Sequence, residues 1–137
     1  MEARPIFGQG DASYRAAGEL EGLTRLVEEF YQQMDRLPAA GRIRAMHPED
    51  LKESKRKLVY FLSGWLGGPK LYKEHYGSII IPSAHRHLDV NSDDADMWLL
   101  CMANALDLQP YESEFKEYLL DQLRVPATRI YQACGNF

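Results

Sequence analysis

Residues 20–36 carry the pattern that most restricts the fold of this chain, an apolar side chain at every third or fourth position. That spacing follows the turn of an α-helix with one buried face, and it does not match the alternation of a strand. The polar residues Glu28 and Gln32 fall largely on the other face. The apolar face comprises Leu23, Leu26, Val27, Phe30, Tyr31 and Met34. Tyr31 is therefore expected at the interior of the molecule or at its margin.

The same spacing recurs in four further segments, and no sustained strand signal accompanies them. Glycine and proline separate the segments, as in Pro38 and in Gly67-Gly68-Pro69, where a helix cannot continue. The predicted helices cover about residues 12–17, 20–36, 49–66, 91–108 and 110–134, the last one bent at Pro126. The predicted fold class is all-α.

In the predicted helix 49–66, one stripe of residues is expected to face inward. Its members are Leu51, Ser54, Leu58, Phe61, Leu62 and Trp65. Ser63 is expected to lie outside the stripe, in solvent, and Ser54 is the one polar member of the apolar face.

Length and charge limit the class of protein. The chain has 137 residues, enough for one domain at 11–137 behind a flexible tail at 1–10. Its net charge of −4 does not favour binding to nucleic acid or to an anionic membrane, which are themselves negatively charged. Cys101 and Cys134 have no disulfide or zinc spacing, and no apolar run is long enough to span a bilayer. A cytoplasmic location is expected.

The stretch from Trp65 to Trp98 contains the residues with the most distinctive chemistry. A helix stopped at Gly67, a long loop and a second helix carrying Trp98 would together form one wall of a cofactor pocket. The loop ends in two histidines, His85 and His87, and the residues alone do not rank them. A zinc site at this pair lacks a third ligand at a supporting spacing.

A haem pocket needs an axial ligand, an apolar slot, and polar donors facing the bound ligand. The slot could be lined by Leu58, Phe61, Leu62 and Met102. Tyr31 and Trp98 could direct an O–H and an N–H toward a ligand, although periodicity alone favours amphipathic core aromatics at both positions. Composition and periodicity therefore leave a small all-α domain with a candidate cofactor pocket.

Seven short motifs or single residues, in a fixed order along the chain, point to a known family. The markers are Phe30-Tyr31, residues 45–51 (Ala-Met-His-Pro-Glu-Asp-Leu), Trp65-Leu66-Gly67-Gly68-Pro69, Tyr72, Tyr76-Gly77, His85 and residues 96–102 (Asp-Met-Trp-Leu-Leu-Cys-Met). In this order and spacing the chain resembles a group II truncated haemoglobin from about Tyr14 to its C-terminus. The resemblance implies a two-over-two helical sandwich that encloses haem b, iron protoporphyrin IX.

The resemblance also implies roles for single residues. The family's iron ligand lies eight residues after the glycine at Gly77 and thirteen before the tryptophan at Trp98, which selects His85 as the metal ligand rather than His87. A backbone carbonyl is expected to accept from the second ring nitrogen of His85. Tyr31, His47 and Trp98 correspond to the cage around the ligand. Ser54 takes the position of the distal histidine in ordinary globins, and Leu58 follows over the porphyrin.

The chain departs from the family pattern on the side of the iron ligand. Residues 80–84 replace a segment that is usually rich in arginine and that pairs with a haem propionate. Propionate contacts are therefore expected to shift to Lys57, Tyr72, Arg86 or His87. The connector at 37–44 also exceeds that of the shortest members, which could let Tyr31 or His47 move toward the iron.

Three functions follow as hypotheses. The first is binding of O2, CO or NO, for oxygen storage, sensing or redox chemistry in preference to rapid oxygen transport. The second is a haem enzyme that detoxifies NO, nitrite or peroxide, with a reductase as partner. The third is a cofactor-free helical interaction module. The resemblance adds the expectation of a monomer or weak dimer without nucleic acid or membrane partners.

Overall fold

The computed structural model describes residues 6–81 and 85–135. Within these ranges the chain forms helices and turns and no strand, as the all-α prediction requires. The elements are α1 (Ala12–Ala16), α2 (Glu19–Arg36), the 3-10 turn η1 (Pro38–Ala40), α3 (Gly41–Ala45), α4 (Lys52–Trp65), α5 (Leu71–Tyr76), α7 (Ser92–Asp107) and α8 (Ser113–Ala133).

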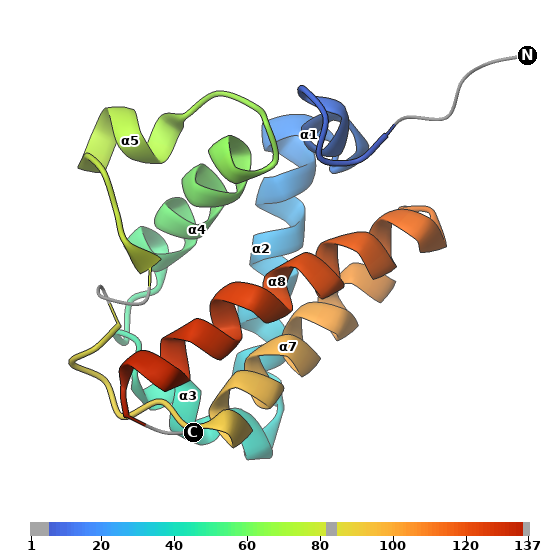
Figure 1. Cartoon of the computed structure of the whole chain (residues 1–137). Coiled ribbons are helices and arrows are strands. Elements are labelled where there is room, and N and C mark those ends of the chain that lie inside the picture. Colours follow the sequence, from blue (N-terminus) through green and yellow to red (C-terminus); the bar gives the residue numbers. More distant parts are fainter. Residues whose placement is uncertain (1–5, 82–84, 136–137) are drawn as a thin grey trace, which may run out of the picture.

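Two pairs of long helices make the body of the molecule. α7 and α8 lie side by side, and α2 packs against both α4 and α7, so that the α2/α4 pair covers the α7/α8 pair (Figure 1). This is the two-over-two sandwich. The core between the pairs includes Phe30, Leu62, Met102 and Leu119, each with no exposed surface. None of the helices in the described part of the chain is both long and apolar enough to span a bilayer.

The Gly67-Gly68 turn fixes how the N-terminal part docks. Gly67 has a φ of +93°, and a Cβ there would meet the Gly10 carbonyl oxygen at 1.9 Å. A Cβ on Gly68 would lie 2.4 Å from the Tyr14 ring, and the Tyr14 amide donates to the Leu66 carbonyl at 3.1 Å. Glycine is needed at both positions because α1 rests directly on the turn.

The segment before α1 also packs. The Phe7 ring lies 5.5 Å from Phe115 and 5.0 Å from Tyr118, and the Gly8 amide donates to the Ser13 hydroxyl. Residues 1–5 of the predicted tail lie outside the described ranges, and the division into residues 1–10 and 11–137 stays a prediction.

The inward stripe predicted on α4 is wrong at two positions. Ser63 has no exposed surface, and its hydroxyl donates to the Pro69 carbonyl at 2.7 Å, which satisfies the polar group in the core. Trp65 is 38% exposed at the end of the helix. The helical spacing alone could not detect this, because the chain reverses at Gly67 and covers Ser63 instead of Trp65.

Two helix starts also differ from the prediction. α4 begins at Lys52, whose amide is held by the Asp50 carboxylate at 2.9 Å, and α8 begins at Ser113 rather than Pro110. α7 begins with a capping box: the Asn91 side chain accepts from the Asp94 backbone amide, and the Asp94 carboxylate accepts from the Asn91 backbone amide.

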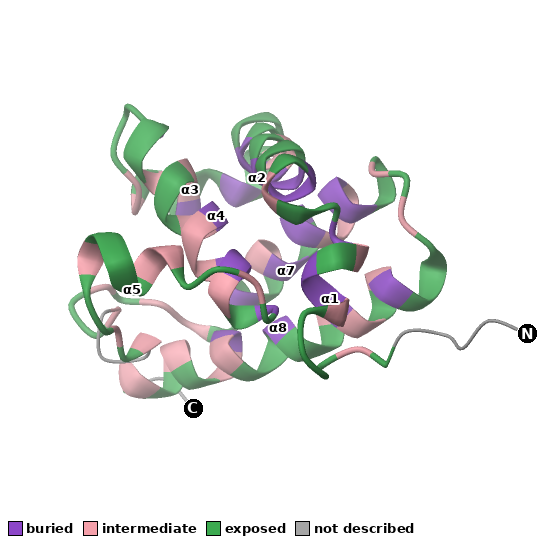
Figure 2. Cartoon of the chain, turned by 90° about the horizontal axis from the view of Figure 1, so that it is seen from above, coloured by how far each residue is buried: buried purple, intermediate pink, exposed green. Residues whose placement is uncertain are grey.

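Burial is uneven across the molecule. Buried residues gather where α2, α4 and α7 meet, whereas α5 has none (Figure 2). The helices α2, α4 and α7 thus form a close-packed core, whereas α5 lies outside that core.

Candidate functional site

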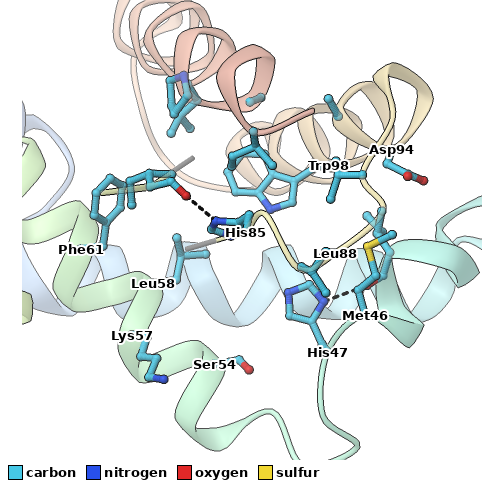
Figure 3. A pocket seen from close by; sticks show the side chains of 18 of the residues that line it. Met46, His47, Ser54, Lys57, Leu58, Phe61, His85, Leu88, Asp94 and Trp98 are labelled. Carbon is cyan, nitrogen blue, oxygen red and sulfur yellow. Dashed lines mark hydrogen bonds between the residues drawn. The ribbon is translucent and has the colours of Figure 1, made fainter. Parts of the chain in front are cut away.

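A cavity of about 350 Å³ lies among α2, α3, α4, α7, α8 and the segment that follows α5. Figure 3 shows Ser54, Lys57, Leu58 and Phe61 along α4, which forms one wall, and Trp98 of α7 on another. Ten site residues named from the sequence line the cavity: Tyr31, His47, Ser54, Lys57, Leu58, Phe61, Tyr72, His85, His87 and Trp98.

Three other site residues named from the sequence do not line the cavity. Leu62 and Met102 are fully buried in the core and do not line the cavity. Arg86 is exposed and is also outside the lining, whereas His87, its alternative for a propionate, belongs to it. Residues 82–84 of the segment that departs from the family pattern lie outside the described ranges.

His85 presents one ring nitrogen to the cavity. Its Nδ1 lies 2.8 Å from the Ile81 carbonyl oxygen, and because a carbonyl can only accept, Nδ1 carries the proton. In the neutral ring, Nε2 then has a free lone pair, the form in which imidazole binds a metal. The Cys134 thiol donates to the backbone carbonyl of His85 at 3.4 Å, which joins this turn to the end of α8.

Tyr31 also lines the cavity, from the buried face of α2. Its side chain is 4% exposed, and burial raises the pKa of Tyr31 to about 12, against a smaller opposing effect of the Arg44 charge. The hydroxyl therefore stays protonated at neutral pH and can donate. The Tyr31 and Trp98 rings both pack on Phe30, with centroids 4.9 and 4.8 Å from it, so the core fixes both polar aromatics.

His47 lies beside Tyr31, with ring centroids 5.5 Å apart. Its Nδ1 bonds to the Ile43 carbonyl at 2.8 Å, so Nδ1 is the protonated nitrogen. Burial lowers the pKa of His47, as do the charges of Arg44 and His85, while the bond to Ile43 acts in the opposite direction. The neutral ring leaves Nε2 as an acceptor, so at neutral pH His47 does not add to the donors Tyr31 and Trp98.

The connector that carries His47 is tied down by two arginines. Arg44 pairs with Asp35 at 2.6 Å and donates to the carbonyls of Pro48 and Glu49. Arg42 donates to both carboxylate oxygens of Asp94, at 3.1 and 3.0 Å, across to the start of α7. The longer connector is thus helical and anchored in this structure.

Some residues that line the cavity were not predicted as site residues from the sequence. Asp94, buried beside the cavity, could have been found from its place in the capping box of α7. Leu88, Pro126 and Ile130 also line it. No local signal in the sequence identifies these three residues, because the segment between α5 and α7, which contains Leu88, meets the end of α8 only in the tertiary structure.

The donor set and the lining fit a haem group. His85 offers one imidazole whose Nδ1 is bonded to the backbone, Leu58, Phe61 and other apolar side chains supply the slot, and Lys57 supplies a cation in the lining. Within the described residues no three His, Cys, Asp or Glu side chains cluster as ligands for a bare metal ion. The volume falls in the range of small-molecule and cofactor sites.

Known proteins resemble this chain in sequence and in fold. The description "Bacterial-like globin" belongs to the family profile that matches residues 12–132. Group 2 truncated haemoglobin YjbI of Bacillus subtilis is 37% identical over 117 residues, covering 85% of this chain and 86% of its own length.

Solved structures agree with the sequence match. The group II 2-on-2 haemoglobin of Agrobacterium tumefaciens superposes with a TM-score of 0.83 at 31% identity, covering 95% of this chain and 97% of its own. The oxygen-avid truncated haemoglobin of Bacillus subtilis has a TM-score of 0.78 at 35% identity, covering 86% and 97%. The similarity therefore extends over the whole helical body that surrounds the cavity.

Proposed function

The chain belongs to the bacterial-like globins and is a group II truncated haemoglobin, and on that premise we propose that it binds haem b and holds O2 at iron ligated by His85. Binding of haem and of diatomic gases is the general property of the globin family. The proposal adds the ligating residue, the residues around the gas and the physiological role.

On the iron side, the proposal rests on the neutral imidazole of His85. The Ile81 carbonyl holds Nδ1–H and so fixes both the tautomer and the ring orientation. Such a hydrogen bond also raises the basicity of the ligating nitrogen. When bound, the haem would supply reversible gas binding at ferrous iron, and the chain supplies the ligand, the apolar slot and the exclusion of water.

On the gas side, Tyr31 and Trp98 are the proposed donors. Bound O2 carries partial negative charge, so a hydrogen bond from each donor is worth about 1.5–3 kcal/mol. Each 1.4 kcal/mol or so slows release about tenfold, which suits storage or sensing better than rapid transport. The oxygen-avid relative of Bacillus subtilis supports this choice.

The free thiols Cys101 and Cys134 suit a reducing compartment, and the cytoplasm is the proposed setting.

One observation carries the proposal: His85, with its Nδ1 bonded to the Ile81 carbonyl, borders the same apolar cavity as the buried, protonated Tyr31. The test is reconstitution with haemin and absorption spectra of the ferric, ferrous and CO-bound forms. His85→Ala should lose the five-coordinate ferrous spectrum and release haem at least about 100-fold faster, more than the loss of an outer partner causes.

His87→Ala is the matched control, because His87 lines the same cavity two residues away. It should keep the five-coordinate ferrous spectrum, and the loss of a propionate contact should speed haem release far less than His85→Ala does. A colourless protein after reconstitution would contradict haem binding and favour the cofactor-free module. Equal haem loss in both variants would contradict His85 as the ligand.

A haem enzyme is the second candidate, favoured by the aromatic contacts that run from Trp98 through Phe30 to Tyr31 beside the cavity. These rings could donate hydrogen bonds or relay electrons during turnover of NO, nitrite or peroxide. Steady-state turnover by the reconstituted protein should exceed that of free haemin, and it should fall in Trp98→Phe. Turnover no greater than that of haemin would contradict the enzyme hypothesis.

A further inference from the structure

Positive charge is concentrated in one segment of this acidic chain. Residues 52–76, which contain α4 and α5, hold six Lys and Arg against two Glu, a net charge of +4. Since the whole chain carries −4, the remaining residues carry −8. A local excess of one sign on an oppositely charged protein attracts and orients a partner of the opposite charge.

Two of these cations are free to meet a partner. Lys70 and Lys73 are exposed, and neither forms an ion pair with any residue in the described ranges. Arg56 and Lys57 of α4 lie 5.9 and 5.4 Å from the centroid of the Tyr76 ring of α5. We call the surface formed by Lys70, Lys73 and Trp65, which line one hollow, the α4/α5 face.

Lys70 and Lys73 border a second hollow of about 270 Å³ between α4 and α5. Trp65 and Phe61 also line this hollow. The two rings are stacked, with centroids 5.9 Å apart and planes at 21°. Trp65 is an exposed aromatic side chain amid cations, the composition of an interface anchor with a charged rim.

The stacked pair connects the surface to the candidate haem cavity. Phe61 lines both the hollow and the larger cavity, as do Tyr72 and Ile79. A molecule seated over Trp65 is therefore separated from the cavity by two aromatic side chains in contact. The short aromatic connection suits a partner that exchanges electrons, whereas a lipid surface or a nucleic acid would use only the charge.

We propose that the α4/α5 face docks an acidic one-electron carrier protein, with Lys70 and Lys73 pairing with its carboxylates and Trp65 packed against its redox centre. This rests on the proposed function, because the electron must have a haem to reach. The reduced flavin or iron–sulfur centre of the partner would lose one electron, and the ferric iron of a haem held by His85 would gain it and become ferrous. No covalent bond forms or breaks in this step.

The experiment uses the haem-reconstituted full chain and a bacterial flavodoxin, an acidic one-electron flavoprotein, as the probe. Binding is measured by calorimetry and by NMR shifts at low ionic strength, with the chain held in its CO-bound form. The double variant Lys70→Glu/Lys73→Glu should bind flavodoxin about tenfold or more weakly. The wild-type affinity should fall with added salt.

The matched control is Arg124→Glu/Arg129→Glu, which makes the same change of charge at exposed positions on α8. It should bind flavodoxin nearly as the wild type does. Equal weakening by both double variants would overturn the docking face, because only net charge would then matter. Binding to phosphatidylglycerol vesicles with none to flavodoxin would overturn it in favour of a lipid surface.

A second readout concerns Trp65. Stopped-flow reduction of the ferric protein by flavodoxin hydroquinone should slow several-fold in Trp65→Leu and be largely retained in Trp65→Phe. Reduction by dithionite should be the same in all variants. An unchanged rate in Trp65→Leu would overturn the role of Trp65. Absorption spectra and CO binding are measured for every variant. If both are normal, an unchanged reduction rate in Trp65→Leu contradicts the docking proposal and not the proposal of haem binding.

Discussion

The two sides of the cavity are built by different means. The Tyr31 side, formed by α2 and α7, is part of the hydrophobic core: Tyr31 is 4% exposed and packs on fully buried Phe30. The His85 side is a turn with half-buried residues, tied to Ile81 and Cys134 by hydrogen bonds. Residues on the first side are therefore expected to affect both folding and gas binding, and residues on the second mainly haem retention.

The largest expected effect is a difference in stability between two leucines. Leu62→Ala opens a cavity in the core behind the Tyr31 side and should lower the free energy of unfolding by about 3 kcal/mol. Leu88→Ala, on the half-buried His85 side, should cost about 1 kcal/mol or less. Urea unfolding of the CO-bound protein measures both. Equal losses would remove the contrast between the two sides.

Alkaline pH gives the next effect. Burial raises the pKa of Tyr31 to about 12 in the folded chain, above its ordinary value of 10.0, so its contribution to stability is complete below pH 10 and is lost as pH rises toward 12. This contribution amounts to about 2 to 3 kcal/mol. Tyr31→Phe should lose correspondingly less stability than the wild type between pH 10 and 12, measured by urea unfolding. Identical pH profiles would contradict the buried, protonated hydroxyl.

Gas release should respond to the same hydroxyl. Tyr31→Phe removes one donor while keeping the ring packed on Phe30, and O2 dissociation should accelerate about tenfold, equal to about 1.4 kcal/mol. Tyr111→Phe is the control, because that hydroxyl donates to the Ala17 carbonyl and does not line the cavity. Flash photolysis and stopped-flow mixing measure the rates. A change in the control as large as that in Tyr31→Phe would point to general loosening of the fold.

The smallest effect is expected at Cys134. A thiol-to-carbonyl bond is weak, about 0.5–1 kcal/mol, so Cys134→Ala should speed haem loss about twofold to fivefold through the His85 turn. Cys134→Ser keeps a donor and should restore most of the retention. Transfer of haem to an apoglobin acceptor measures the rates. If serine behaves as alanine does, packing rather than the hydrogen bond holds the turn.

Much of the fold is determined by the sequence itself. Apolar spacing in α2, the capping pair Asn91 and Asp94, and the Gly67-Gly68 stop act within a few residues of the chain, so they can be read without a structure. The ordered markers from Phe30 to Met102 identify the family for the same reason, because each is a local motif with a fixed separation from the next.

The tertiary structure alone decided how distant segments meet. It buried Ser63 and exposed Trp65, since the turn at Gly67 directs the following chain over one side of α4. It joined Arg42 to Asp94 and Cys134 to His85, pairs separated by 52 and 49 residues. Periodicity predicts which face of a helix is apolar, but only packing determines which neighbour covers that face and which polar groups find partners.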